Sequence, residues 1–220
     1  WNVKSYNNDF TDEWGLGGFM SECVSQQRNY EWYICQDTTE YWPSYNCAPT
    51  SIVMACLWTN KDFPYTVGDA RSNYHPEGGG WYTEVISNCL TVFNVDFSVR
   101  DLPDYRSEAT GIFNEELDNG NILLFCVDVH YLRLCQNEAH RVDKYYRTIR
   151  LGTGHAIIIK GYKMVDGELF YEAYDPAGLS FKYEDGHCKG RGRYYRADDL
   201  YTASFASWKK VFVISDSPAG

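Results

Sequence analysis

The chain has 220 residues, which is enough for one sizeable domain, or for two lobes around a cleft, without disulfides to supply a core. Aromatic residues make up 17% of it, which argues against disorder, and its formal net charge of −10 at pH 7 disfavours binding to nucleic acid or to anionic membrane surfaces. No apolar run approaches the roughly 18 residues of a membrane span, so membrane insertion is not expected, and nothing in the sequence indicates an oligomeric state.

The first thirty residues mix aromatic side chains with Asn, Asp and Gly and show no sustained period. They are predicted to form an irregular N-terminal arm, residues 1–30, packed on the domain. The chain starts at Trp1 with no apolar leader, and its composition is rich in Tyr and Asn. These features suggest an exported bacterial protein whose signal peptide has been removed, and hence an extracellular or cell-surface location.

The stretch from Asn46 to Trp58 indicates a cysteine at the start of a buried helix, after an extended piece over 31–36 and a polar loop over 37–44. Asn46 and Cys47 occupy the N-cap region, Pro49 suits the first turn, and an apolar run follows. A thiol at this point feels the positive end of the helix dipole, which favours the thiolate. The plainer alternative is that Cys47 is a small apolar residue with no chemical role.

The remainder of the first half reads as helical. Residues 60–80 are predicted to be mostly connecting chain, and apolar residues at helical spacing predict an amphipathic helix over 81–93. Alternation at Val95, Phe97 and Val99 predicts a strand, and a further helix carrying Leu117 closes at Asn119-Gly120.

The second half reads mainly as sheet. Nearly continuous apolar runs over 122–129 and 156–159 predict strands covered on both faces, and strands are also expected over 169–174 and 209–215. The basic run over 189–193 is interpreted as a solvated loop. This order predicts an α+β fold and a single domain over 31–220, with a helical lobe over about 31–118 and an antiparallel sheet lobe over about 119–220.

His155 and Asp175 are the candidates for acid-base chemistry. His155 starts the strand that contains Ala156, and Asp175 ends its partner strand, 20 residues later, across the turn Asp166-Gly167. The start of one strand in a hairpin lies opposite the end of the next, so the two side chains are predicted to be neighbours. Asp175 could then hold one ring nitrogen of His155 and leave the other facing the sulfur of Cys47.

At these residues the chain resembles the papain-like cysteine peptidases of the C39 and C39-like group. That group typically has Cys-Gly-Pro-Thr/Ala-Ser at the nucleophile, a His-strand-Gly-Tyr segment and an Asp-Pro pair. The matching segments span about two-thirds of the chain and are Gln36, Asn46–Ser51, Gly154–Tyr162 and Tyr174–Pro176.

The resemblance implies a papain-like cysteine proteinase fold and a cysteine peptidase that acts on a peptide or protein substrate with no cofactor or metal. Carried over, Cys47 would be the nucleophile, His155 the general base and acid, Asp175 the orienting residue, and Gln36 an oxyanion donor together with the Cys47 backbone N–H. Ala48 stands where the group usually has Gly, and its Cβ either narrows the site or is harmless if the backbone there is helical.

Other functions use the same residues. A catalytically weak or inactive relative would bind peptide or glycan, and a related amidase or transpeptidase would act on cell-wall peptides. The aromatic residues that could line a cleft near the nucleophile are Trp42, Tyr45, Trp58 and Trp81, although core packing suits Trp58 better.

Cysteine usage leaves two further questions open. With Cys47 free, the other seven cysteines allow up to three disulfides and a second free thiol, or a fully reduced set. A competing zinc set has suitable residue types but spacings that match no usual zinc pattern, and consists of Cys126, His130, Cys135 and His140.

Overall fold

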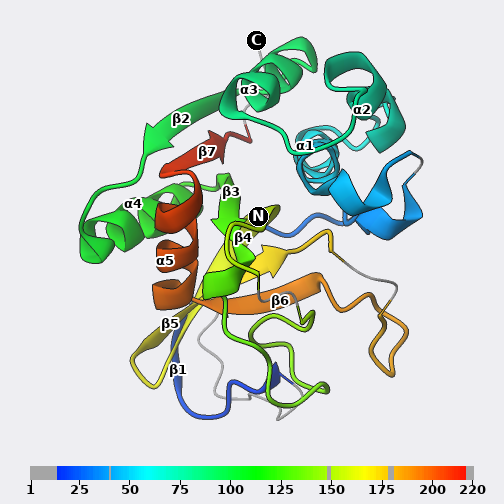
Figure 1. Ribbon diagram of the computed structural model, residues 1–220. Coiled ribbons are helices and arrows are strands. Elements are labelled where there is room, and N and C mark those ends of the chain that lie inside the picture. Colours follow the sequence, from blue (N-terminus) through cyan, green and yellow to red (C-terminus); the bar gives the residue numbers. More distant parts are fainter. Residues whose placement is uncertain (1–13, 40, 148–149, 178–180, 217–220) are drawn as a thin grey trace.

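The computed structural model describes residues 14–39, 41–147, 150–177 and 181–216, and over these residues the chain has an α+β fold built on an antiparallel sheet (Figure 1). The helices are α1 (Cys47–Thr59), α2 (Val67–Tyr74), α3 (Thr83–Val92), α4 (Arg106–Asp118) and α5 (Ala197–Ser207). The strands are β1 (Met20–Ser25), β2 (Phe97–Asp101), β3 (Ile122–Asp128), β4 (Gly154–Val165), β5 (Glu168–Tyr174), β6 (Arg191–Arg196) and β7 (Lys210–Ile214). Short 3-10 turns are η2 (Gln36–Thr38), η3 (Pro43–Tyr45) and η4 (Val129–Tyr131).

The sheet runs in the order β2-β7-β3-β4-β5-β6, with β1 paired to β4 beside this path. Strand β4 is the organising strand. It pairs with β5 from Ile158 to Val165, while β3 pairs with its first half and β1 with its second half. Strands β1 and β3 therefore follow each other along one edge of β4, and β5 pairs with the other edge.

Helices cover both faces of the sheet, with α1 and α3 on one side and α4 and α5 on the other (Figure 1). Strand β3 shows why: Leu124 faces the α1 core and Leu123 faces the α4–α5 core, and all seven of its residues are buried. The prediction that this apolar run is covered on both faces is confirmed.

Helix α1 is apolar on nearly all sides, as expected of a helix enclosed by other elements. Its residues from Ala48 to Cys56 are all buried, and the Ser51 hydroxyl donates a hydrogen bond of 3.1 Å to the Ala156 carbonyl of β4. The N-terminus of α1 is thereby fixed at the start of β4. The helices predicted over 81–93 and up to Asn119-Gly120 are also confirmed, as α3 and α4.

Strand β1 is absent from the sequence prediction, which expects an irregular arm over residues 1–30; residues 1–13 lie outside the described part. Its pairing depends on tertiary contact with β4, where Gly161 permits a close approach. A Cβ at Gly161 would lie 2.1 Å from the carbonyl oxygen of Val24. A strand of six residues with Met20 and Val24 as its main buried apolar positions carries too weak an alternation to be recognised alone.

Two helices were also missed. Residues 60–80 contain α2, which a capping box starts: Thr66 accepts from the Asp69 N–H, and the Asp69 carboxylate accepts from the Thr66 N–H. This Thr-x-x-Asp pattern is a local sequence signal for a helix start. Helix α5 buries mainly small residues besides Leu200, so its apolar periodicity is weak.

The interpretation of residues 189–193 as a solvated loop is wrong. Arg191–Arg196 is strand β6, and Arg193 is fully buried. Its guanidinium donates to the backbone carbonyls of His140, Val142 and Asp143, which satisfies the charge without exposing it. No helix of the described residues is long and apolar enough to cross a membrane.

Candidate active site

Cys47 is the first residue of α1 and is half-buried. His155, from the start of β4, and the backbone N–H groups of Ala48 and Ala156 all act to lower the pKa of the Cys47 thiol. Burial by itself raises the pKa of the thiol, but the hydrogen bond and positive charge of His155 outweigh it and hold the pKa of Cys47 below its usual value. The thiolate is therefore favoured at this position.

Asn46 occupies the N-cap position of α1, but its side chain does not cap the helix. Instead its amide nitrogen donates to the Thr39 hydroxyl at 2.8 Å and to the Tyr41 carbonyl at 2.7 Å, and its oxygen accepts from Arg71 at 2.9 Å. Asn46 thus ties the loop ahead of Cys47 together, a role that the sequence did not indicate.

Ala48 is the second residue of α1 and is buried in the core on the α1 side of the sheet. Because the backbone here is helical, a Cβ is accommodated without conformational strain. Of the two possibilities raised for the replacement of Gly, the geometry favours the harmless one.

His155 and Asp175 are brought together as the hairpin argument predicts. His155 Nε2 lies 2.7 Å from Asp175 Oδ1, and the two residues are 8% and 0% exposed. Burial disfavours the imidazolium, yet the Asp175 charge and the hydrogen bonds to Asp175 and Cys47 raise the pKa of His155 above its usual value. With Nε2 directed at Asp175, Nδ1 is the ring nitrogen left to face the sulfur.

Asp175 is held by more donors than the sequence indicated. The Tyr195 hydroxyl donates to Oδ2 at 2.5 Å, the Tyr146 hydroxyl at 3.3 Å, and the Ala177 N–H donates to Oδ1 at 2.9 Å. Burial raises the pKa of Asp175, but His155, Tyr195 and the Ala177 N–H outweigh it and hold the pKa below its usual value, so the carboxylate stays ionised. The Tyr146 ring also packs edge-on against His155, with centroids 5.9 Å apart.

Neither tyrosine was identified from the sequence. Tyr195 lies on β6, just beyond the basic run over 189–193 that is interpreted as a loop, and Tyr146 lies in the irregular segment between β3 and β4. The sequence signal for this strand is the adjacent pair Tyr194-Tyr195 shortly after Gly192, because tyrosine is common in strands and glycine in the turns that precede them.

Gln36 is buried and starts the turn η2. Its backbone N–H donates to the Pro176 carbonyl at 2.8 Å, which joins it to the Asp175-Pro176 segment. Its side-chain nitrogen donates to the Pro43 carbonyl at 3.0 Å, ahead of α1. The structure therefore places Gln36 between the segments that lead to Cys47 and follow Asp175, with one amide hydrogen already used.

Two of the four aromatic residues considered as cleft walls are exposed. Trp42 and Tyr45 are about half exposed and pack edge-on at 6.4 Å, whereas Trp58 and Trp81 are buried in the core. Trp42 holds a left-handed backbone conformation, with φ 52° and ψ 46°, which is unfavourable for a bulky side chain. Such strain is often found next to functional sites.

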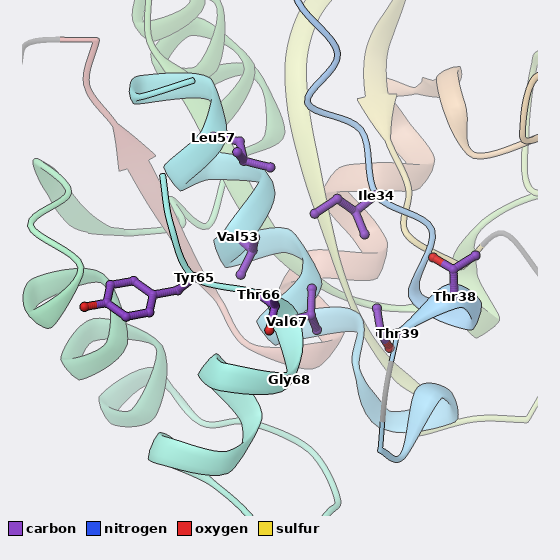
Figure 2. Close-up of a pocket in the computed structure, with 9 residues that line it drawn as sticks. All are labelled: Ile34, Thr38, Thr39, Val53, Leu57, Tyr65, Thr66, Val67 and Gly68. Carbon is purple, nitrogen blue, oxygen red and sulfur yellow. The ribbon is translucent and has the colours of Figure 1, made fainter. Parts of the chain in front are cut away.

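A cavity of about 400 Å³ lies beside α1 (Figure 2). Val53 and Leu57 of α1 form one wall, Thr38 and Thr39 another, and the residues around the start of α2 a third. Cys47, His155 and Asp175 do not line it. Thr39, which lines the cavity, connects it to the residues around Cys47, because its hydroxyl donates to the Gln36 carbonyl and accepts from the Asn46 side chain.

The zinc set considered from the sequence is not brought together, and among the described residues no group of three or more His, Cys, Asp or Glu side chains is arranged to hold a metal ion. Cys135 contacts the Asn137 carbonyl, and His130 packs on Tyr131. All eight cysteines are free thiols in the structure, so of the two cysteine arrangements considered, the structure has the fully reduced one.

Comparisons with known proteins concern the fold. No protein-family model and no curated protein matches the sequence. Among the solved structures similar to this chain is one described as a "putative C39-like peptidase from Bacillus anthracis". It matches with a TM-score of 0.52 at 10% sequence identity, over 84% of this chain and 94% of that chain. At this identity the likeness shows a shared fold, in agreement with the resemblance seen in the motifs.

Proposed function

We propose that this chain is a papain-like cysteine peptidase of the C39-like type, which hydrolyses peptide or amide bonds with Cys47, His155 and Asp175. The observation that carries the proposal is the buried pair of His155 and Asp175, with 2.7 Å between Nε2 and Oδ1, which acts on a thiol at the start of α1 and lowers its pKa. A thiol beside a buried imidazole that a carboxylate orients is the arrangement that nucleophilic acyl transfer requires.

In the proposed reaction the Cys47 thiolate attacks the carbonyl carbon of the scissile bond and forms a tetrahedral intermediate. The His155 imidazolium donates its proton to the leaving nitrogen, the C–N bond breaks, and a thioester remains on Cys47. His155, now neutral, then takes a proton from water, which attacks the thioester and releases the acid. The second tetrahedral intermediate collapses, the C–S bond breaks, and Cys47 leaves as the thiolate while His155 keeps the proton, which restores the ion pair.

The negative oxygen of each tetrahedral intermediate needs donors. The backbone N–H of Cys47 lies in the first turn of α1, where N–H groups have no partner within the helix. The second amide hydrogen of Gln36 is the proposed side-chain donor, since the first is held by the Pro43 carbonyl.

The proposed substrate is an extended peptide or protein segment that passes between the helical part carrying Cys47 and the sheet carrying His155 and Asp175. Exposed Trp42 and Tyr45 lie directly ahead of the nucleophile and offer apolar contact to such a segment.

Cleavage of a peptide library, together with iodoacetamide labelling mapped by mass spectrometry at pH 7, tests the proposal. The wild type is expected to cleave a subset of peptides and to label first at Cys47. Cys47→Ala is expected to lose at least about 10³-fold in kcat/KM, because no other group supplies the nucleophile. Cys23→Ala, which removes a half-buried thiol away from His155, is the matched control. Equal cleavage by wild type and Cys47→Ala would refute the proposal, and an unreactive Cys47 would favour a binding role.

A further inference from the structure

Arg71 of α2 is a buried cation that the proposed mechanism does not use. Its side chain is 1% exposed, and none of the described carboxylates pairs with it. An arginine this deeply buried ordinarily has an ionic partner, because removing its charge from water is costly.

The guanidinium is satisfied by neutral groups from three segments. Nε donates to the Asn46 side-chain oxygen at 2.9 Å, and a terminal nitrogen donates to the Tyr45 carbonyl. The other terminal nitrogen donates to the carbonyls of His75 and Gly79, each at 3.2 Å. The planar donor set of arginine makes such a multiple bridge possible, and lysine could not reproduce it.

This bridge acts on the residues immediately before Cys47. Tyr45 and Asn46 lead into α1, and Asn46 is also bonded to Thr39 and Tyr41. Arg71 therefore holds the segment whose position sets where the sulfur lies. The face of Trp81, 5.5 Å from the guanidinium carbon, closes the other side.

The charge of Arg71 is also directed at the site. Among the described residues, His155 from β4, Cys126 from β3 and Arg71 from α2 interact electrostatically with Cys47. Burial keeps Cys126 neutral by raising the pKa of its thiol well above the usual value. Among the described residues, His155 and Arg71 are thus two cations that can stabilise a thiolate at Cys47, and Arg71 does so from its bonds to Tyr45 and Asn46 directly ahead of the nucleophile.

We propose that Arg71 is a positioning residue of this site: it fixes Tyr45 and Asn46 ahead of Cys47 and supplies a buried positive charge that favours the thiolate. The inference rests on the proposed function. It adds a residue that acts through Cys47 and does not touch the substrate.

The test separates the two roles of Arg71. The iodoacetamide labelling rate of Cys47 is measured from pH 5 to 10 in the wild type, Arg71→Gln and Arg71→Lys, with circular dichroism as the check of folding. Arg71→Gln is expected to label about tenfold more slowly at pH 6 and at nearly the wild-type rate at pH 10, which corresponds to a rise of about one unit in the thiol pKa. Arg71→Lys retains the charge and is expected to keep a profile close to wild type while losing at least about fivefold in kcat, because the bridge is broken.

Arg28→Gln is the matched control. Arg28 also lies over a tryptophan ring, at 4.2 Å from Trp58, and bonds a backbone carbonyl, but it pairs with Asp216 and lies at the opposite end of α1 from Cys47. Its labelling profile is expected to equal the wild type. If Arg71→Gln does not fold, Asn46→Ala decides the positioning role: it keeps the charge, cuts the Nε bond, and should lower kcat with an unchanged pH profile.

The outcomes distinguish this inference from the proposed function. If wild-type Cys47 is unreactive, the proposed function itself fails. A reactive Cys47 whose profile is unchanged in folded Arg71→Gln, or whose kcat is unchanged in Asn46→Ala, overturns the role of Arg71 alone.

Discussion

Two buried ion pairs join the same two strands, and they differ in what they face. His155 of β4 pairs at 2.7 Å with Asp175, directly after β5, and Lys160 of β4 pairs at 2.8 Å with Glu172 of β5. All four side chains are less than 9% exposed, so burial does not distinguish the pairs.

The pairs differ in what each cation contacts besides its carboxylate. His155 keeps one ring nitrogen for Cys47, whereas Lys160 donates a second hydrogen bond to the Ser25 hydroxyl and lies 5.0 Å from the centroid of the Tyr174 ring. Ser25 in turn donates to Glu172 and closes the group. The Lys160 pair thus attaches β1 to the hairpin, while the His155 pair at the strand ends is left open to a nucleophile.

Two thiols, Cys23 near Lys160 and Cys47 near His155, also differ in the direction in which their pKa values are shifted. Burial raises the pKa of Cys23, and the more distant charges of Lys163 and Lys160 only partly offset this. In Cys47 the direct hydrogen bond from His155 reverses the direction. A buried cation in the neighbourhood is therefore not sufficient by itself to activate a thiol.

The largest expected difference between the pairs is in catalysis. Asp175→Asn should lower kcat by about 10²- to 10⁴-fold, because an amide can hold His155 in the wrong tautomer and does not stabilise the imidazolium. Glu172→Gln, assayed well below its unfolding temperature, should stay within about threefold of wild type. Steady-state kinetics on a cleaved peptide provide the measurement, and similar losses in both variants would abolish the distinction.

The next largest effect is on stability and concerns the other pair. Glu172→Gln leaves Lys160 buried without its carboxylate and should lower the free energy of unfolding by about 3–5 kcal/mol in denaturant titrations at pH 7. Burial alone would raise the pKa of Glu172, but Lys160 and Ser25 hold it below its usual value. The stabilisation is therefore complete above the unfolded carboxyl pKa of about 4.3 and is lost as pH falls through the lower folded pKa. A difference that persists unchanged at pH 2 would contradict this account.

The smallest effect separates the two thiols. At pH 7, Cys47 should react with iodoacetamide at least about tenfold faster than Cys23, since the pKa of Cys47 is lowered and that of Cys23 is raised. Both rates should rise with pH and converge once both thiols are ionised. Peptidase activity should follow the Cys47 curve on the acid side and fall on the alkaline side through the raised pKa of His155. Mass spectrometry of the two cysteine-containing peptides measures both rates in one sample. Equal rates at pH 7 would contradict the activation of Cys47 by His155.

The sequence by itself determined the parts of the site that depend on local pattern. The apolar runs of β3 to β5 and the turn Asp166-Gly167, where both residues have positive φ, fix a hairpin that places His155 opposite Asp175. The helix start at Cys47 follows from Pro49 and the apolar run behind it. Each of these signals lies within a few residues of the feature it predicts, so no long-range contact had to be known.

Only the tertiary structure decided what surrounds them. Arg71 reaches the site from a segment predicted to be connecting chain, Tyr146 and Tyr195 reach it from segments with no predicted element, and β1 becomes a strand only by pairing with β4. Their sequence patterns are weak because their partners are neutral carbonyls, single carboxylate oxygens or a strand edge, each far away along the chain. Packing of α1 against the start of β4 brings Cys47 to His155, and burial there sets the balance of charge between them.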